Sequence, residues 1–124
     1  MIYGIGTDMI EISRIEKAIA AHAGFLARVY TEEEIAYCRE KGVETFAGRF
    51  AAKEAILKAL GHGANGWFFT DMEILPDTLG KPVVFCYGPV QEYMAERGIN
   101  KIHLSIAHSR ELATAYAVAE VMDL

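Results

Sequence analysis

Residues 50–61 have the sequence Phe50-Ala51-Ala52-Lys53-Glu54-Ala55-Ile56-Leu57-Lys58-Ala59-Leu60-Gly61. The stretch is rich in small and apolar residues and predicts the second half of a long buried helix over about 43–60 that stops at Gly61. At about 100° of rotation per residue, Glu54 leaves this helix among apolar neighbours, where a carboxylate needs a partner. One interpretation is an ordinary ion pair with Lys58, four residues further on. The other is a carboxylate that serves a ligand.

A second carboxylate follows the apolar run at the N-terminus. Residues 2–8 predict a short buried strand, and Asp8 stands where a helix over about 9–22 is expected to begin. Gly4 and Gly6 would allow another backbone or a ligand to approach closely. Asp8 and Glu54 are the kind of carboxylate pair that binds Mg²⁺ together with water and phosphate. An ordinary N-cap role for Asp8, with Glu11 at capping-box spacing, is about as well supported by the residues alone.

The remaining pattern mixes helices and strands without regular alternation. We expect helices over 25–29, about 31–41 and 89–97, strands over 68–75 and 82–87, and a terminal hairpin over 101–108 and 112–121. Thr31 is the expected N-cap of its helix, and the three acids after it, Glu32, Glu33 and Glu34, are expected to be surface charges that complement the helix dipole.

The last strand carries alanine at every second position, which places four methyl groups on one face: Ala113, Ala115, Ala117 and Ala119. We expect the long helix to pack closely on this face, although a subunit interface would also suit it. The prediction is therefore an α+β fold, with a largely antiparallel sheet packed against a long helix.

Length and composition indicate one domain over residues 1–124. The chain is 52% apolar, contains no linker-like stretch, and is long enough to bury a core of its own. It has neither an apolar run of membrane-spanning length nor a charged signal region, so we expect a cytoplasmic protein without a membrane partner, with Cys38 and Cys86 reduced. The net charge of −5 argues against nucleic-acid binding.

Four blocks in the chain, taken together and in order, are characteristic of a known family. They are Gly6-Thr7-Asp8 with Arg14-Ile15, Gly48-Arg49-Phe50-Ala51-Ala52-Lys53-Glu54-Ala55 with Lys58-Ala59 and Gly61, Gly80-Lys81-Pro82, and Ser105-Ile106-Ala107-His108-Ser109. Over essentially its whole length the chain resembles the bacterial holo-[acyl-carrier-protein] synthase family of 4′-phosphopantetheinyl transferases. The resemblance implies that family's fold and its reaction in fatty acid biosynthesis, a branch of lipid metabolism. In that reaction the phosphopantetheine group of coenzyme A moves to a serine of apo acyl carrier protein, and adenosine 3′,5′-bisphosphate leaves.

The resemblance also implies roles for particular residues. Asp8 and Glu54 would hold Mg²⁺, and Lys58 would stabilise the leaving phosphate. From the residues themselves, two groups could accept the serine proton: Glu54 is the first choice, because apolar surroundings should raise its proton affinity, and His108 is the second. The family forms homotrimers with active sites between subunits, which would bring side chains to coenzyme A across the interface. The residues assigned to coenzyme A are Arg49, Lys58, Gly61, Gly63, Gly80, Lys81, Pro82, His103, Ser105, His108 and Ser109.

An acidic carrier protein should dock on exposed basic residues. Arg14 is the first candidate, followed by Lys17 and Arg28, although all three could be solvated helix charges. Two other classes of function remain open. A non-catalytic coenzyme A or nucleotide-binding module would need neither Asp8 nor Glu54, and a trimeric scaffold would use its apolar faces for assembly alone.

Overall fold

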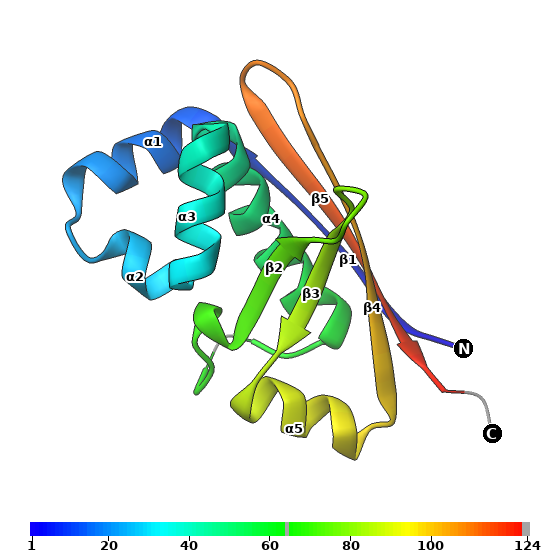
Figure 1. Cartoon of the computed structure of the whole chain (residues 1–124). Helices are drawn as coiled ribbons and strands as arrows, with labels where there is room; N and C mark the ends of the chain where they lie inside the picture. Colours follow the sequence, from blue (N-terminus) through cyan, green and yellow to red (C-terminus); the bar gives the residue numbers. More distant parts are fainter. Residues whose placement is uncertain (64, 123–124) are drawn as a thin grey trace.

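A computed structural model describes residues 1–63 and 65–122, in which two antiparallel sheets surround one long helix (Figure 1). In chain order the elements are β1 (Ile2–Glu11), α1 (Ile12–Ala21), α2 (Phe25–Val29), α3 (Glu32–Lys41), α4 (Val43–Leu60), the 3₁₀ turn η1 (Phe69–Asp71), β2 (Met72–Pro76), β3 (Pro82–Cys86), α5 (Gly88–Glu96), β4 (Ile99–His108) and β5 (Leu112–Val121). No helix within these described ranges is long and apolar enough to cross a lipid bilayer.

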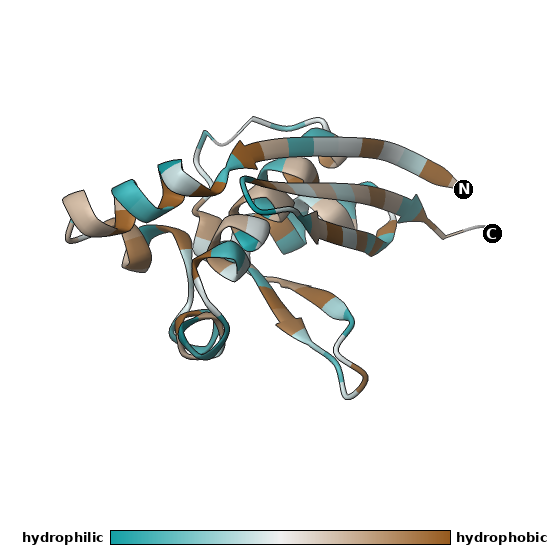
Figure 2. Ribbon diagram, turned by 90° about the horizontal axis from the view of Figure 1, so that it is seen from above, coloured by the Kyte–Doolittle hydropathy of each residue, from teal (hydrophilic) through white to brown (hydrophobic). Residues whose placement is uncertain are grey.

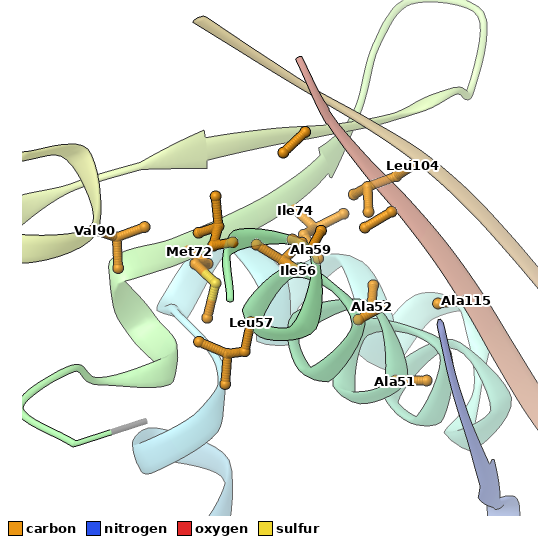
Figure 3. Packing of buried hydrophobic residues seen from close by; sticks show 14 of the residues in the cluster. Ala51, Ala52, Ile56, Leu57, Ala59, Met72, Ile74, Val90, Leu104 and Ala115 are labelled. Atoms are coloured by element: carbon orange, nitrogen blue, oxygen red, sulfur yellow. The ribbon is translucent and has the colours of Figure 1, made fainter. Parts of the chain in front are cut away.

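Helix α4 is the centre of the core. It packs on the inner face of a three-stranded sheet of order β1-β5-β4, while side chains of the two-stranded β2-β3 sheet cover another side of the helix. Figure 3 shows Met72 and Ile74 of β2 beside Ile56, and Ala115 of β5 beside Ala51 and Ala52. The four alternating alanines of β5 are each at most 1% exposed in the single chain. The predicted packing of α4 on this alanine face is confirmed, and a subunit interface there is excluded.

The predicted α+β class is confirmed, but several boundaries were wrong. β1 continues past Asp8 to Glu11, because its pairing with β5 extends to Glu11 opposite Leu112. α1 therefore begins only at Ile12, and the N-cap interpretation of Asp8 is wrong. The strand expected from residue 68 begins at Met72, since Asp71 closes a 3₁₀ turn by accepting a hydrogen bond from the Phe68 amide.

The three-stranded sheet has a second face, which α4 does not cover. Side chains on β1 alternate, so Gly4, Gly6 and Asp8 face the helix while Ile5 and Met9 point outward. Ile5 is 71% exposed, Met9 63%, and Tyr116 on the neighbouring β5 61%. β3 contacts the edge strand β4, and the turn of the β2-β3 hairpin projects away from the three-stranded sheet (Figure 2). The fold thus leaves an apolar sheet surface open to solvent.

Candidate active site

Two glycines bring β1 into direct contact with the backbone of α4. A Cβ atom at Gly4 would lie 2.1 Å from the carbonyl oxygen of Ala59, and one at Gly6 would lie 2.0 Å from that of Ala55. No side chain fits in either place. Asp8 is the next residue on the same face of the strand, so this contact sets its position relative to the acid and the lysine on α4.

Lys58 pairs with Asp8 rather than with Glu54. Its Nζ lies 3.3 Å from Asp8 Oδ1 and donates to the Thr7 carbonyl oxygen at 2.9 Å. The Lys58 side chain is 55% exposed and that of Asp8 20%. Within the described part of the chain no cationic side chain forms an ion pair with Glu54. The ion pair between Glu54 and Lys58 that the helical spacing allowed is therefore not formed.

Of the two acids, Asp8 and Glu54, Glu54 has the less well compensated negative charge, because Lys58 pairs with Asp8. Partial burial raises its pKa above the ordinary value, the negative charge of Asp8 raises it further, and Lys58 acts in the opposite direction. Glu54 and Asp8 line one cavity of about 370 Å³, together with Arg14, Phe25 and Phe50. A group that brings positive charge to this cavity would relieve the repulsion between the two acids.

The glycine-rich turn after α4 forms part of a second cavity beside Glu54. Glu54 and Lys58 line a second cavity, of about 290 Å³, with Gly61 and Gly63. Gly61 ends the helix with φ +70°, a left-handed conformation that glycine adopts without cost. His62, which could have been a simple exposed side chain, instead stacks on Trp67 with ring centroids 3.9 Å apart.

Other predicted coenzyme A residues lie elsewhere in the single chain. Gly80 and Lys81 belong to the β2-β3 turn, where Asp77 Oδ1 accepts a hydrogen bond from the Lys81 amide, and Pro82 begins β3. His103 and Ser105 lie on β4 in register with Val118 and Tyr116, on the sheet face away from α4.

His103 already has a neighbour on that outer face, because its Nε2 lies 3.1 Å from Glu120 Oε1. His108 and Ser109 are exposed at the β4-β5 turn, where Ser109 Oγ accepts hydrogen bonds from the Glu111 and Leu112 amides. None of these four residues lines either of the cavities, of about 370 and 290 Å³, that contain Glu54.

Arg49 is buried on α4, with its guanidinium 4.9 Å from the centre of the Tyr37 ring. Its Nε has no hydrogen-bond partner within the described residues. The three residues assigned to carrier docking, Arg14, Lys17 and Arg28, are all exposed, and Arg14 alone of them lines the Asp8–Glu54 cavity.

Comparisons with known proteins identify the family of this chain. The sequence profile of the 4′-phosphopantetheinyl transferase superfamily matches residues 4–119. The chain belongs to this superfamily. A holo-[acyl-carrier-protein] synthase of Clostridium beijerinckii is 49% identical over 98% of this chain and 100% of the relative.

Solved structures of the superfamily have the same fold. The holo-[acyl-carrier-protein] synthase of Neisseria meningitidis superimposes with a TM-score of 0.86 at 40% identity, covering 97% of this chain and 99% of that one. The enzyme of Bacillus anthracis, solved in complex with coenzyme A (3′,5′-ADP), gives 0.81 at 40% identity, with 98% and 99% covered. The predicted family, fold and phosphopantetheinyl transferase class are confirmed.

The residues of this transferase also fit a hard divalent cation. Asp8 and Glu54 supply oxygen donors to one cavity, and burial, followed by repulsion from Asp8, raises the pKa of Glu54. In the described ranges no third histidine, cysteine or acid joins them. Two carboxylates completed by water and phosphate are typical of Mg²⁺ rather than of zinc.

One buried network in this transferase was missed by the sequence analysis. Lys53 Nζ, fully buried, donates to Glu34 Oε1 at 2.7 Å, to the Val29 carbonyl at 2.6 Å and to the Phe69 carbonyl at 3.1 Å. Burial lowers the pKa of Lys53, and the charge of Glu34 opposes that change. The expectation that Glu34 is a surface charge is therefore wrong.

Glu34 also completes the capping box of α3. Its Oε1 accepts from the Thr31 amide, and its Oε2 accepts from the Ile74 amide of β2 at 2.8 Å. The Thr31-to-Glu34 spacing was the signal that could have separated this acid from Glu32 and Glu33, because a capping-box glutamate turns back toward its own N-cap.

Proposed function

We propose that the chain transfers the 4′-phosphopantetheine group of coenzyme A to a serine of apo acyl carrier protein, for fatty acid biosynthesis in the cytoplasm. The observation that carries this proposal is the meeting of Asp8, Glu54 and Lys58 where β1 touches α4, in a chain of the phosphopantetheinyl transferase superfamily. The coenzyme A complex of the B. anthracis relative supports the choice of co-substrate.

The reaction joins the serine Oγ to the phosphorus that carries pantetheine, and it breaks the bond from that phosphorus to the oxygen of the adenosine phosphate. Glu54 accepts the proton of the serine. Partial burial and the neighbouring charge of Asp8 raise its pKa in the metal-free site, and a bound cation would act in the opposite sense. The bond electrons remain on adenosine 3′,5′-bisphosphate, and Lys58, exposed at the edge of the site, stabilises that charge. When bound between Asp8 and Glu54, Mg²⁺ would neutralise charge on the diphosphate.

We further propose that the enzyme is a homotrimer with active sites between subunits. The open sheet face with Ile5, Met9 and Tyr116 supports a subunit interface, since exposed apolar surface of this kind marks association sites. His103 and Ser105 share this face, and His108 and Ser109 lie at its end, so assembly would carry them to a neighbouring subunit's site. Arg49, with its unpaired Nε, is suited to the 3′-phosphate of coenzyme A together with His108 and Ser109.

The other proposed contacts to coenzyme A and to the carrier protein come from the glycine turn, the β2-β3 hairpin and α1 and α2. Gly61 and Gly63 lie beside Glu54 and Lys58, where glycine backbone lets a diphosphate come close. Gly80, Lys81 and Pro82 would reach the nucleotide from the β2-β3 hairpin. Arg14, at the edge of the Asp8–Glu54 cavity, would receive the acidic carrier protein, with exposed Lys17 of α1 and Arg28 of α2 as further docking contacts.

Incubation of the protein with apo carrier protein, coenzyme A and Mg²⁺ tests the function directly. We expect the mass of the carrier protein to increase by one phosphopantetheine group, and adenosine 3′,5′-bisphosphate to appear in equal amount. Coenzyme A binding without transfer would instead identify a non-catalytic binding module, and neither binding nor transfer would identify a scaffold.

A further inference from the structure

The buried ion pair between Lys53 and Glu34 has no part in the proposed chemistry, yet it links five segments of the chain: α4, α2, α3, η1 and β2. Lys53 lies on α4 directly before Glu54, and its three ammonium hydrogens are all used, by the end of α2, by α3 and by η1. Glu34 accepts from the amide of Ile74 as well, which adds β2. Within the described ranges, none of the side-chain polar atoms of this pair is left without a partner.

Helix α2 is held in place by the Lys53–Glu34 pair, which we call the anchor. Five residues are too few for a helix to be stable by itself in water, so α2 needs tertiary contacts to persist. Lys53 binds the carbonyl of Val29, the last residue of α2, and Tyr30 next to it donates from its hydroxyl to the Phe46 carbonyl at 2.7 Å. The end of this short helix is thereby tied to α4 at two points.

The opposite end of α2 forms part of the active site. Phe25, its first residue, stacks on Phe50 of α4 with ring centroids 6.3 Å apart and lines the cavity that contains Asp8 and Glu54. Val29 and Tyr30 pack with Ile15 of α1 in one apolar cluster, and α1 carries Arg14 to the edge of the same cavity. A change at the anchor would therefore move the wall of the cavity without touching the two acids.

We propose that the Lys53–Glu34 pair is a positioning device for the carrier-protein side of the active site, which holds α2 and the packed α1 so that Phe25 and Arg14 face Glu54. This inference rests on the proposed transferase function. Lys53 and Glu34 touch no reacting atom and are positioning residues. Loss of the pair should weaken use of the carrier protein while coenzyme A binds as before, because among the described residues Arg49, Lys58 and the glycine turn share no hydrogen bond with the pair.

The test compares Glu34→Gln and Lys53→Met with Lys41→Met, an exposed lysine at the end of α3 that serves as the control. Each protein is assayed well below its own unfolding temperature, with rates normalised to the folded fraction. We expect the KM for the carrier protein to rise about tenfold in both pair variants, because small misplacements of binding groups are costly, while calorimetric coenzyme A affinity changes by less than about twofold. A role in stability alone would leave both the normalised kcat and the carrier KM unchanged.

Amide hydrogen exchange gives a second readout that does not depend on the reaction. Exchange over 25–30 should become faster in both pair variants, while exchange over β4 and β5 stays as in the wild type. A wild-type protein without transferase activity would refute the proposed function, and the exchange rates would still decide whether the pair holds α2. An unchanged carrier KM, an equal loss of coenzyme A affinity, unchanged exchange over 25–30, or failure of both pair variants to fold would overturn the positioning role.

Discussion

Two lysines of α4, five positions apart, pair with acids in opposite surroundings. Lys53 and Glu34 are both 0% exposed, and every ammonium hydrogen of Lys53 has an acceptor. Lys58 and Asp8 are 55% and 20% exposed, at a longer 3.3 Å, and face the two cavities that Glu54 lines. The first pair is closed within the protein, whereas the second can exchange its partners for a ligand.

The difference shows how one helix can carry both a pair that stabilises the fold and a pair that is available to a ligand. A buried pair holds its geometry because breaking it leaves a charge without solvent, while an exposed pair contributes little to stability and can reorganise when substrate arrives. The same substitution at the two lysines should therefore give opposite results in stability and in catalysis.

Glu54→Gln should produce the largest effect, because it removes both the proposed base and a cation ligand from the open site. We expect the transfer rate to fall about 10⁴-fold, equivalent to about 5.5 kcal/mol, with little loss of stability. Single-turnover transfer measured by mass spectrometry gives the rate, and urea unfolding gives the stability. A variant with more than a tenth of the wild-type rate would remove Glu54 from the chemistry.

Lys53→Met tests the closed pair. Removing one partner should lower the free energy of unfolding by about 3–5 kcal/mol, since Glu34 is left as an uncompensated buried charge. Urea unfolding monitored by circular dichroism measures this loss. A loss below about 1 kcal/mol would mean that water reaches the pair and that the two regions do not differ as described.

Much of the fold could be predicted because its signals are local. The apolar run of α4, its terminal glycine and the alternating alanines of β5 each depend on only a few neighbouring residues, and all three features are found in the structure. Gly4 and Gly6 predicted that a backbone or a ligand would approach β1 closely, and in the structure the backbone of α4 does so. The boundary of β1 was missed because pairing with a strand far along the chain extended it beyond Asp8.

The site was partly predictable for a different reason. Asp8, Glu54 and Lys58 could be selected as residue types suited to one chemistry, and the structure places them around adjoining cavities. Lys53 and Glu34 are a lysine and an acid, as are Lys58 and Asp8, so residue charge alone could not separate the closed pair from the open one. Only the packing of α2, α3 and β2 around Lys53 makes that distinction.

Lys58→Met is the matched counterpart of Lys53→Met. It should slow transfer about 10²-fold by removing one positive charge from the leaving phosphate, and it should change the free energy of unfolding by no more than about 1 kcal/mol. Rate and stability are measured as for the other variants. A large loss of stability with normal transfer would show that this pair, too, is structural.

The smallest expected effect is the dependence of stability on pH that Glu54 contributes in metal-free buffer. Partial burial, and then the charge of Asp8, raise its folded pKa above the ordinary value of 4.5, so the folded state holds the proton more tightly than the unfolded chain does. The stabilising contribution of this carboxyl is complete below that unfolded value and is lost as the pH rises through the raised folded pKa. The wild type should therefore lose stability relative to Glu54→Gln across this interval, in urea unfolding with a chelator present. Mg²⁺ favours the ionised carboxylate and should reduce or reverse the trend, whereas parallel curves for the two proteins in chelator would show that Glu54 titrates as an ordinary exposed acid.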